Sequence, residues 1–272
     1  MLELAPVGTP TKTPVYRFST DEAGTISYLG ACSSTTAVTT ATLGENNIAL
    51  TGLLTGSYVG CQIKITDSVG NLSNILTLST FEIDVDGPAL TVDALTTKLS
   101  QPALSGTTDD ALASITVRVN GVDYLAVNNG TTWSVASGTI ASLADGIYDI
   151  AVTSTDALGN IGNDVTTGEL KIDNAGPTVV ADSHSPIGST TNRMPTVRIK
   201  LVDSISGVNP ATIALRINGV AVVSSYNAVT GEITYTPTRA LSLRKYTVTV
   251  DAKDMLLNAM PRYSFNFTIV AE

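Results

Sequence analysis

The sequence predicts an all-β protein made of three tandem Greek-key β-sandwiches in an extended arrangement. The chain has 272 residues, of which 43% are hydrophobic and only 14% charged, with abundant strand-forming residues. Several segments recur at a constant offset along the chain, as in repeat architectures. No long window keeps a helical period without interruption by Gly, Pro or β-branched residues, so strands are favoured over helices.

The clearest repeat has an offset of 98 residues, because ITVRVNGV from Ile115 returns as IALRINGV from Ile213. The same offset holds downstream, where YDIAVTSTDALGN from Tyr148 matches YTVTVDAKDMLLN from Tyr246. A fainter first copy starts at Tyr58 and runs through CQIKITDSVGN. One offset shared by two separate motifs indicates a structural unit that is repeated along the chain.

Two short segments separate the copies. IDVDGP ends at Pro88 and IDNAGP ends at Pro177, and each lies between two alternating strand patterns. Their Asp/Gly/Pro composition is typical of short, stiff linkers. We therefore expect domains at residues 1–87, 88–176 and 177–272.

Alternation of apolar residues predicts the strands within each copy. Tyr148, Ile150 and Val152 face one side of their strand while the residues between them face the other, which predicts a half-buried strand. Asn120-Gly121 and Asn218-Gly219 lie between β-forming runs, and Asn-Gly supplies the two positive-φ positions of a type I′ hairpin turn. About seven short strands per copy favour a Greek-key sandwich over a barrel or propeller.

A tyrosine, an alternating apolar strand and then T-D-x-x-G-N resembles the penultimate strand and following turn of bacterial Ig-like domains. The second copy carries the fullest set, with LSGTTDD, ITVRVNG, LADGIYDIAVTSTDALGN and DNAGPTV in the expected order. The third copy resembles a sister type, although LSLRKY replaces a glycine-bearing turn and MLLN lacks the usual glycine, so we expect its last turn to differ in shape. The resemblance implies immunoglobulin-like sandwiches of large cell-surface adhesins and extracellular proteins.

Cys32 and Cys61 are the only cysteines, and the first copy resembles family members that carry two. The resemblance implies a disulfide between them. In the chain-entropy model such a bond contributes roughly 3 to 4 kcal/mol, which helps a small sandwich in an oxidising compartment. The alternative is a pair of buried reduced thiols, because free cysteine is often a core residue. The sequence lacks the Cys-x-x-Cys or His-pair spacing of a zinc site.

Acidic residues gather near the two linkers. In a seven-stranded sandwich the B–C and F–G turns return to the pole that meets the preceding linker. Oxygen atoms from the linker and from these two turns then converge. Ca²⁺ binds about 6 to 8 hard oxygen ligands, so such a group suits it. The candidate calcium ligands are Asp86, Asp109, Asp110, Asp156 and Asn160 at the first junction, and Asp173, Asp203, Asp254 and Asn258 at the second. The alternative is that D-x-x-G-N is only a turn device, since Asp and Asn favour turns.

The remaining distinctive side chains have structural interpretations. Tyr58, Tyr148 and Tyr246 resemble the tyrosine corner of Ig-like sandwiches, in which the hydroxyl bonds nearby backbone. Trp133, the only tryptophan, is either a sugar-stacking platform or a core residue, and a lone tryptophan is more often core. His184, the only histidine, is expected in a solvated loop, and no His-dependent catalytic triad forms around a second one.

Charge and motif content exclude several function classes. The net charge of −9 opposes nucleic-acid phosphates and an anionic membrane surface, so neither is an expected partner. No run of about 18 apolar residues is present, and the first residues lack a signal-peptide pattern, so we expect no membrane insertion of this segment and an export signal outside it. The sequence shows no nucleophile and base pair, phosphate loop or paired catalytic carboxylates, and we expect no enzyme.

The expected function is therefore a non-catalytic stalk or spacer of a bacterial surface or secreted protein, located outside the cell. Its expected partners are neighbouring Ig-like domains of a longer chain, and calcium would stiffen the junctions. The alternative is a module that binds a cell-surface glycan or a protein through polar loops, as an accessory to an extracellular enzyme or by itself. The step from sandwich to adhesion rests on family analogy.

Overall fold

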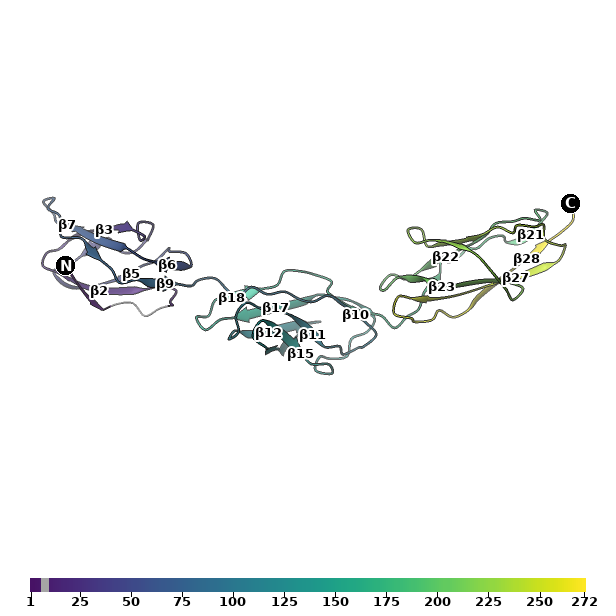
Figure 1. Ribbon diagram of the computed structural model, residues 1–272, viewed down its shortest axis with the longest axis horizontal. Coiled ribbons are helices and arrows are strands. Elements are labelled where there is room, and N and C mark those ends of the chain that lie inside the picture. The colour runs from purple at the N-terminus through teal and green to yellow at the C-terminus, as the bar shows by residue number, and fades with distance from the viewer. Residues whose placement is uncertain (6–9) are drawn as a thin grey trace.

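The computed structural model describes residues 1–5 and 10–272 and confirms the all-β prediction, since these residues form 28 strands and no helix. The strands build three sandwich units that follow one another in chain order, with the two termini at opposite ends (Figure 1). We refer to β1–β9 as unit 1, β10–β19 as unit 2 and β20–β28 as unit 3.

The strands of unit 1 are β1 (Leu2–Ala5), β2 (Val15–Thr20), β3 (Gly24–Gly30), β4 (Thr40–Ala41), β5 (Gly44–Ala49), β6 (Gly56–Tyr58), β7 (Cys61–Thr66), β8 (Leu76–Thr77) and β9 (Phe81–Ile83). Those of unit 2 are β10 (Leu95–Thr97), β11 (Leu104–Thr107), β12 (Ser114–Val119), β13 (Val122–Leu125), β14 (Val127–Asn128), β15 (Thr132–Val135), β16 (Gly146–Tyr148), β17 (Ile150–Thr155), β18 (Ile161–Asn163) and β19 (Leu170–Ile172). Those of unit 3 are β20 (Thr178–Val179), β21 (Gly188–Thr190), β22 (Val197–Val202), β23 (Val208–Ile217), β24 (Val220–Val222), β25 (Ser225–Asn227), β26 (Glu232–Tyr235), β27 (Lys245–Asp254) and β28 (Tyr263–Ile269).

Unit 3 shows the sheet topology most completely. One sheet has the order β20-β22-β26-β25 and the other β21-β28-β27-β23-β24. Because β22 and β23 are consecutive but lie in different sheets, the chain crosses between the layers as in a Greek key. The first strand region serves both sheets, since β20 pairs antiparallel with β22 and β21 pairs parallel with β28.

The same split recurs in the other two units. In unit 2, Leu90 bridges Thr108 antiparallel, and β10 then pairs parallel with β19. In unit 1, β1 pairs antiparallel with β2, and Thr11 bridges Ile83 in parallel. The three units therefore share this split, in which the N-terminal segment of each enters beside the end of β2, β11 or β22.

Each unit has a separate apolar core. Strand β17 buries Ile150 and Val152 on one face, in agreement with the predicted alternation. The three cores contain no shared residue, and no sheet of the described residues joins strands of two units. Each core is thus closed by the sheets of its own unit, so that burial of apolar surface stabilises each unit by itself.

The two Asn-Gly hairpins have the predicted turn conformation. Asn120 and Gly121 have φ of 48° and 82°, and Asn218 and Gly219 have φ of 49° and 81°. The register is that of a two-residue loop, with Val119 opposite Val122 in unit 2. Positive φ at both central residues is the requirement of a type I′ turn, which explains why Asn-Gly occurs at both places.

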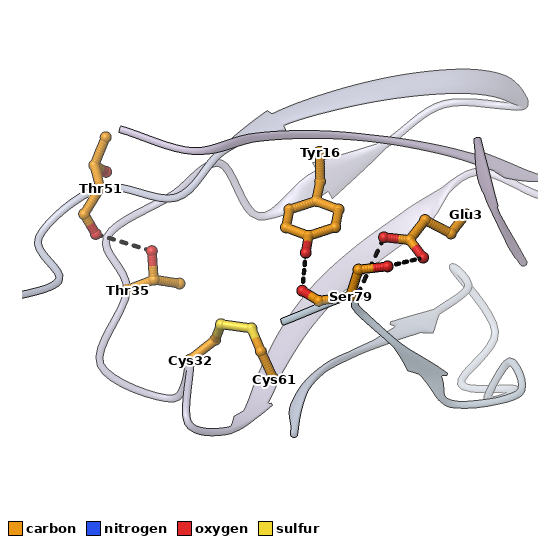
Figure 2. The surroundings of a disulfide bond; sticks show 7 residues. All are labelled: Glu3, Tyr16, Cys32, Thr35, Thr51, Cys61 and Ser79. Carbon is orange, nitrogen blue, oxygen red and sulfur yellow. Dashed lines mark hydrogen bonds between the residues drawn. A yellow bond between two sulfur atoms is a disulfide. The ribbon is translucent and has the colours of Figure 1, made fainter. Parts of the chain in front are cut away.

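Unit 1 contains the disulfide between Cys32 and Cys61, with 5.0 Å between their Cα atoms (Figure 2). Cys32 lies in the turn after β3 rather than on a strand, whereas Cys61 begins β7. Both side chains are buried in the core of the unit. Nearby, Tyr16 donates to the backbone carbonyl of Ser79, whose hydroxyl donates to Glu3 at 2.8 Å. Burial, and then the charge of Glu3, raise the pKa of Tyr16 to about 12.

The three tyrosines make equivalent contacts. The hydroxyls of Tyr58, Tyr148 and Tyr246 donate to the backbone carbonyl four residues earlier, at 3.0, 2.9 and 3.2 Å. This geometry matches the structural role that the tyrosine-corner resemblance implies.

The expectation of a solvated His184 is wrong. Its ring lies 4.5 Å from that of Phe265, and its Nδ1 is 3.0 Å from the hydroxyl of Tyr263. The histidine is half-buried because its loop packs against strand β28 of unit 3.

Candidate functional site

Each unit carries the same asparagine-closed turn, which follows β7 in unit 1, β17 in unit 2 and β27 in unit 3. In unit 2 the Asp156 carboxylate accepts the backbone N–H and the side-chain amide of Asn160, at 2.8 and 2.7 Å. In unit 3 Asp254 accepts the same two groups of Asn258, at 2.6 and 2.5 Å. The aspartate thus satisfies backbone donors within the turn and also fixes the direction of the asparagine side chain.

The oriented asparagine reaches out of its own unit to the preceding linker. The side-chain amide of Asn160 donates to the backbone carbonyl of Asp84 at 3.2 Å. The amide of Asn258 donates to the backbone carbonyl of Asp173 at 3.0 Å. Both acceptors lie three residues before the glycine of their linkers, so the two junctions are closed in the same register. We call this contact the linker clasp.

The linker glycine packs against the same turn. A Cβ on Gly87 would lie 2.1 Å from the carbonyl carbon of Ile161, and one on Gly176 would lie 2.4 Å from that of Ala259. Any side chain at these positions would therefore displace the linker from the turn. The following residues Pro88 and Pro177 are buried, so each junction has a packed centre next to the clasp.

The expectation that the last turn of unit 3 differs in shape is wrong. Leu257 occupies the position that Gly159 has in unit 2, and both residues donate to the turn aspartate carbonyl at 3.1 Å. Leu257 adopts a φ of 67°, close to the 77° of Gly159. The turn therefore requires a left-handed conformation at this position, as at Gly70 of unit 1, and a leucine adopts it only at some cost.

The first predicted acidic group lines a shallow cavity of about 350 Å³ at the first junction. Asp86, Asp109, Asp110 and Asp156 surround it, together with Asp84. Two of these carboxylates accept backbone hydrogen bonds. Asp109 accepts the N–H of Ala89 and Asp110 accepts the N–H of Leu112, both at 2.8 Å. The fifth predicted residue, Asn160, is buried in the clasp. The turn after β11, with Asp109 and Asp110, and the turn after β17, with Asp156, therefore do meet at the linker, as expected.

A lysine of unit 1 also reaches the first junction. Lys12 Nζ lies 3.7 Å from the position that a Cβ of Gly159 would occupy. Burial by itself would raise the pKa of Asp156. Hydrogen bonds from Asn160 and Leu158 and the positive charge of Lys12 outweigh this effect, so the pKa of Asp156 lies below its ordinary value. The first junction thus receives positive charge from the chain itself.

The second junction brings three carboxylates much closer together. Asp173, Asp203 and Asp254 each offer an oxygen, and these atoms lie within 4.8 Å of one another, the one such acidic group among residues 1–5 and 10–272. Asp173 is 1% exposed and Asp254 is fully buried. None of the five ion pairs of the described chain includes any of the three. Buried carboxylates without a paired cation are costly, and this oxygen set suits Ca²⁺.

Backbone N–H groups hold two of these carboxylates in place. Asp203 Oδ1 accepts from Ile205, Ser206 and Gly207 at 2.8 to 3.3 Å. Asp173 Oδ2 accepts from Ser206 at 3.0 Å, which ties the linker to the same loop. Asn258 of the predicted set acts through its amide nitrogen, which donates to the Asp173 carbonyl and to Asp254. The three aspartates are therefore the residues that would hold a cation here.

Sequence reasoning missed Asp84. It corresponds to Asp173 because both follow an isoleucine and precede a linker glycine by three residues, and in both cases a carboxylate oxygen accepts the N–H two residues later. Alignment of IDVDGP with IDNAGP would have found it. Asp86, which the sequence favoured, has no acidic counterpart at Ala175.

Trp133 is buried at 0% exposure, and its Nε1 donates to the backbone carbonyl of Thr91 at 2.9 Å. The core interpretation is therefore correct, and the side chain offers no stacking platform to a sugar.

Residues 86–174 match the family model of the bacterial Ig-like domain. This match confirms the resemblance for the stretch in which the sequence motifs are clearest. A search of the curated proteins gives no match. The described residues contain no helix with the length and apolar character needed to cross a membrane.

Several solved structures resemble the chain. A tetra-tandem repeat from the extending region of a large adhesion protein is 19% identical, with 98% of this chain and 73% of that chain covered and a TM-score of 0.35. The fibronectin(III)-like modules of Clostridium thermocellum CbhA are 11% identical, with 67% and 94% covered and a TM-score of 0.30. SGBP-B of the Bacteroides ovatus mixed-linkage glucan utilization locus, solved in complex with a mixed-linkage heptasaccharide, is 16% identical, with 94% and 63% covered and a TM-score of 0.23.

Proposed function

We propose that this chain is a non-catalytic spacer or adhesive module of a bacterial surface or secreted protein, in which sandwich units are held end to end. The observation that carries the proposal is the linker clasp, which occurs in the same register at both junctions. A clasp that joins a linker to the next unit restricts rotation between units, which a spacer requires and a flexible tether does not.

We also propose that the units are three domains with boundaries at residues 87 and 88 and at residues 176 and 177. The separate cores support this division. An extracellular location is supported by the disulfide of Cys32 and Cys61, since such bonds persist mainly in oxidising compartments.

Calcium at the second junction is the finer part of the proposal. Asp173 belongs to the linker, whereas Asp203 and Asp254 belong to unit 3. A cation shared by them would neutralise three converging charges and fix the linker to unit 3. For the first junction, calcium binding by Asp86, Asp109, Asp110, Asp156 and Asn160 stays a prediction, and Lys12 already supplies positive charge beside Asp156.

The test is thermal unfolding in calcium and in excess chelator. A ligand that binds only the folded state stabilises it by RT ln(1 + [L]/Kd), so calcium should raise the transition of unit 3 by an amount that grows with its concentration. Asp203→Asn should abolish the rise, and Asp110→Asn should preserve it if the second junction is the site. Identical melts in calcium and chelator would leave the clasp as a turn device without metal.

The alternative is carbohydrate binding. Trp133, the aromatic residue considered as a sugar-stacking platform, is buried in the core and does not support it. A glycan array with the intact chain tests the alternative directly, and binding to a defined glycan would favour it over the spacer.

A further inference from the structure

Unit 1 carries a third copy of the asparagine-closed turn, at the pole opposite unit 2. Asp67 accepts the backbone N–H and the side-chain amide of Asn71, both at 2.8 Å, as Asp156 does for Asn160. Asn160 and Asn258 use the same amide nitrogen for a second bond, to a linker carbonyl. Within the described part of the chain, the Asn71 amide has no second acceptor, and Asn71 is exposed whereas Asn160 is buried.

The second turn of this pole is also equivalent to its counterpart in unit 2. The Thr20 hydroxyl bonds the backbone of Glu22 in the same way that the Thr108 hydroxyl bonds the backbone of Asp110. Asp21 therefore corresponds to Asp109. The Asp109 carboxylate accepts the N–H of Ala89, the residue after the linker Gly-Pro, at 2.8 Å. Asp21 has no such partner among the described residues, and its side chain lines a pocket.

The pocket lies where the linker lies in the other units. It has a volume of about 220 Å³ and is bordered by Thr20, Asp21, Asp67 and Asn71. The register sets its position, because Leu2 pairs with Ser19 and thus places Met1 opposite Thr20, as Leu90 lies opposite Thr108. In unit 1 the Asn71 amide and the Asp21 carboxylate therefore face the position that corresponds to the path of the linker in unit 2.

We propose that this pole of unit 1 binds an extended Asp/Gly/Pro peptide, the linker of another Ig-like unit. The Asn71 amide donates to the carbonyl three residues before the peptide glycine, and Asp21 accepts the N–H of the residue after the Gly-Pro pair. The glycine packs against the backbone that follows Asn71, as Gly87 does against Ile161. This inference rests on the proposed function, because it extends the linker clasp to unit 1, but it requires neither calcium nor the second junction.

The test extends the full chain by a copy of residues 83–89, Ile-Asp-Val-Asp-Gly-Pro-Ala, placed directly before Met1. The readout is the side-chain amide signal of Asn71 in an NMR spectrum of ¹⁵N-labelled protein, assigned by its loss in Asn71→Asp. In the extended chain we expect the signal to shift toward that of Asn160 and its hydrogen exchange to slow by about two- to tenfold, the range for one hydrogen bond. An unchanged Asn71 signal would overturn the proposal.

The matched control is the same extension with alanine in place of its glycine. A methyl group at that position would meet the turn backbone, so this extension should leave the Asn71 signal as in the original chain. Equal effects of both extensions would also overturn the proposal. Titration of the original chain with the free peptide separates two sources of the linker. A shift of the Asn71 signal shows that the pole also accepts a linker from another molecule. An unchanged Asn71 signal assigns the pole to a linker of the same chain. All samples contain chelator, so the outcome is independent of the calcium test.

Discussion

At the residue scale, one asparagine per junction connects segments that lie far apart in the sequence. Asn160 bonds Asp156 within its turn and Asp84 in the linker through a single amide group. The aspartate fixes the amide direction, and the linker carbonyl completes its hydrogen bonds. Because the group is buried, removal of the amide would leave two acceptors without their donor.

Asn160→Ala should lower the free energy of unfolding of unit 2 by about 1 to 3 kcal/mol, the cost of unsatisfied buried acceptors. Trp133 is the only tryptophan and lies in the core of unit 2, so its fluorescence during urea unfolding reports this unit alone. The control is Asn163→Ala, an exposed residue whose side chain bonds only Thr153, with an expected change within about 0.5 kcal/mol. Equal losses in both variants would refute the clasp.

A charged group in unit 3 gives a pH-dependent prediction. A hydrogen bond from Arg262, and then the charges of Arg262 and Arg216, hold the pKa of Asp251 below its ordinary 3.8 against the effect of desolvation. Because the folded pKa lies below the unfolded one, the ion pairs stabilise unit 3 above the ordinary pKa, and this stability is lost as the pH falls through the folded pKa.

Arg262→Ala should therefore raise the pKa of Asp251 toward its ordinary value and weaken the acid dependence of unit 3. The measurement is a titration of the Asp251 carboxyl carbon by NMR. Arg118→Ala, which removes an exposed pair with Asp123 in unit 2, should leave the Asp251 titration unchanged. An Asp251 titration that is insensitive to Arg262 would contradict the assignment.

Sequence reasoning succeeded at residues whose role follows from local backbone chemistry. The Asn120-Gly121 dipeptide predicted a type I′ turn, because this turn needs positive φ at both central residues and few residue types tolerate it. Sequence reasoning failed where side-chain contacts decide. Leu257 adopts the left-handed conformation because the turn that Asp254 and Asn258 close requires it. His184 is half-buried because a distant strand, β28, packs against its loop.

At the element scale, the linker and the turn that receives it form one packed structure. The repeat of IDVDGP and IDNAGP predicted the linkers, and the Asp-to-Asn spacing predicted the turns. Their convergence followed from the sandwich topology. The positions of individual carboxylates did not follow, because a two-residue shift in a linker decides whether Asp84 or Asp86 corresponds to Asp173. The sequence predicted acidic groups at both junctions, and only the structure shows that oxygens of three carboxylates lie within 4.8 Å of one another at the second.

Gly87→Ala should separate the linker from the turn of unit 2. The added methyl would lie 2.1 Å from the Ile161 carbonyl carbon, so the linker must move and the Asn160 bond to Asp84 should break. We expect a loss of about 1 to 3 kcal/mol from unit 2, measured by Trp133 fluorescence in urea.

The matched control for this change is Gly146→Ala in the same unit. Its Cβ would meet the Tyr148 ring at an ordinary 3.5 Å, and its backbone needs no positive φ. The Trp133 transition should move little in this variant. If the Gly87 and Gly146 variants unfold alike, the close fit of the linker contributes nothing to unit 2.

At the scale of the whole molecule, the units lie in a row with the termini at opposite ends (Figure 1). Each unit is stabilised by its own core, so the arrangement depends on the two junctions and not on a shared interior. The first junction combines a clasp with Lys12, whereas the second combines a clasp with three carboxylates. The two junctions should therefore differ in their response to divalent cations and to salt.

The central claim is that clasped junctions hold the units as an extended rod, and small-angle X-ray scattering of the intact chain in calcium and in chelator tests it most directly. We expect a long, well-defined maximum dimension in calcium. In chelator the distance distribution should broaden, and Asp203→Asn should show the broad distribution in both conditions. A compact or freely bending chain in calcium would contradict the claim.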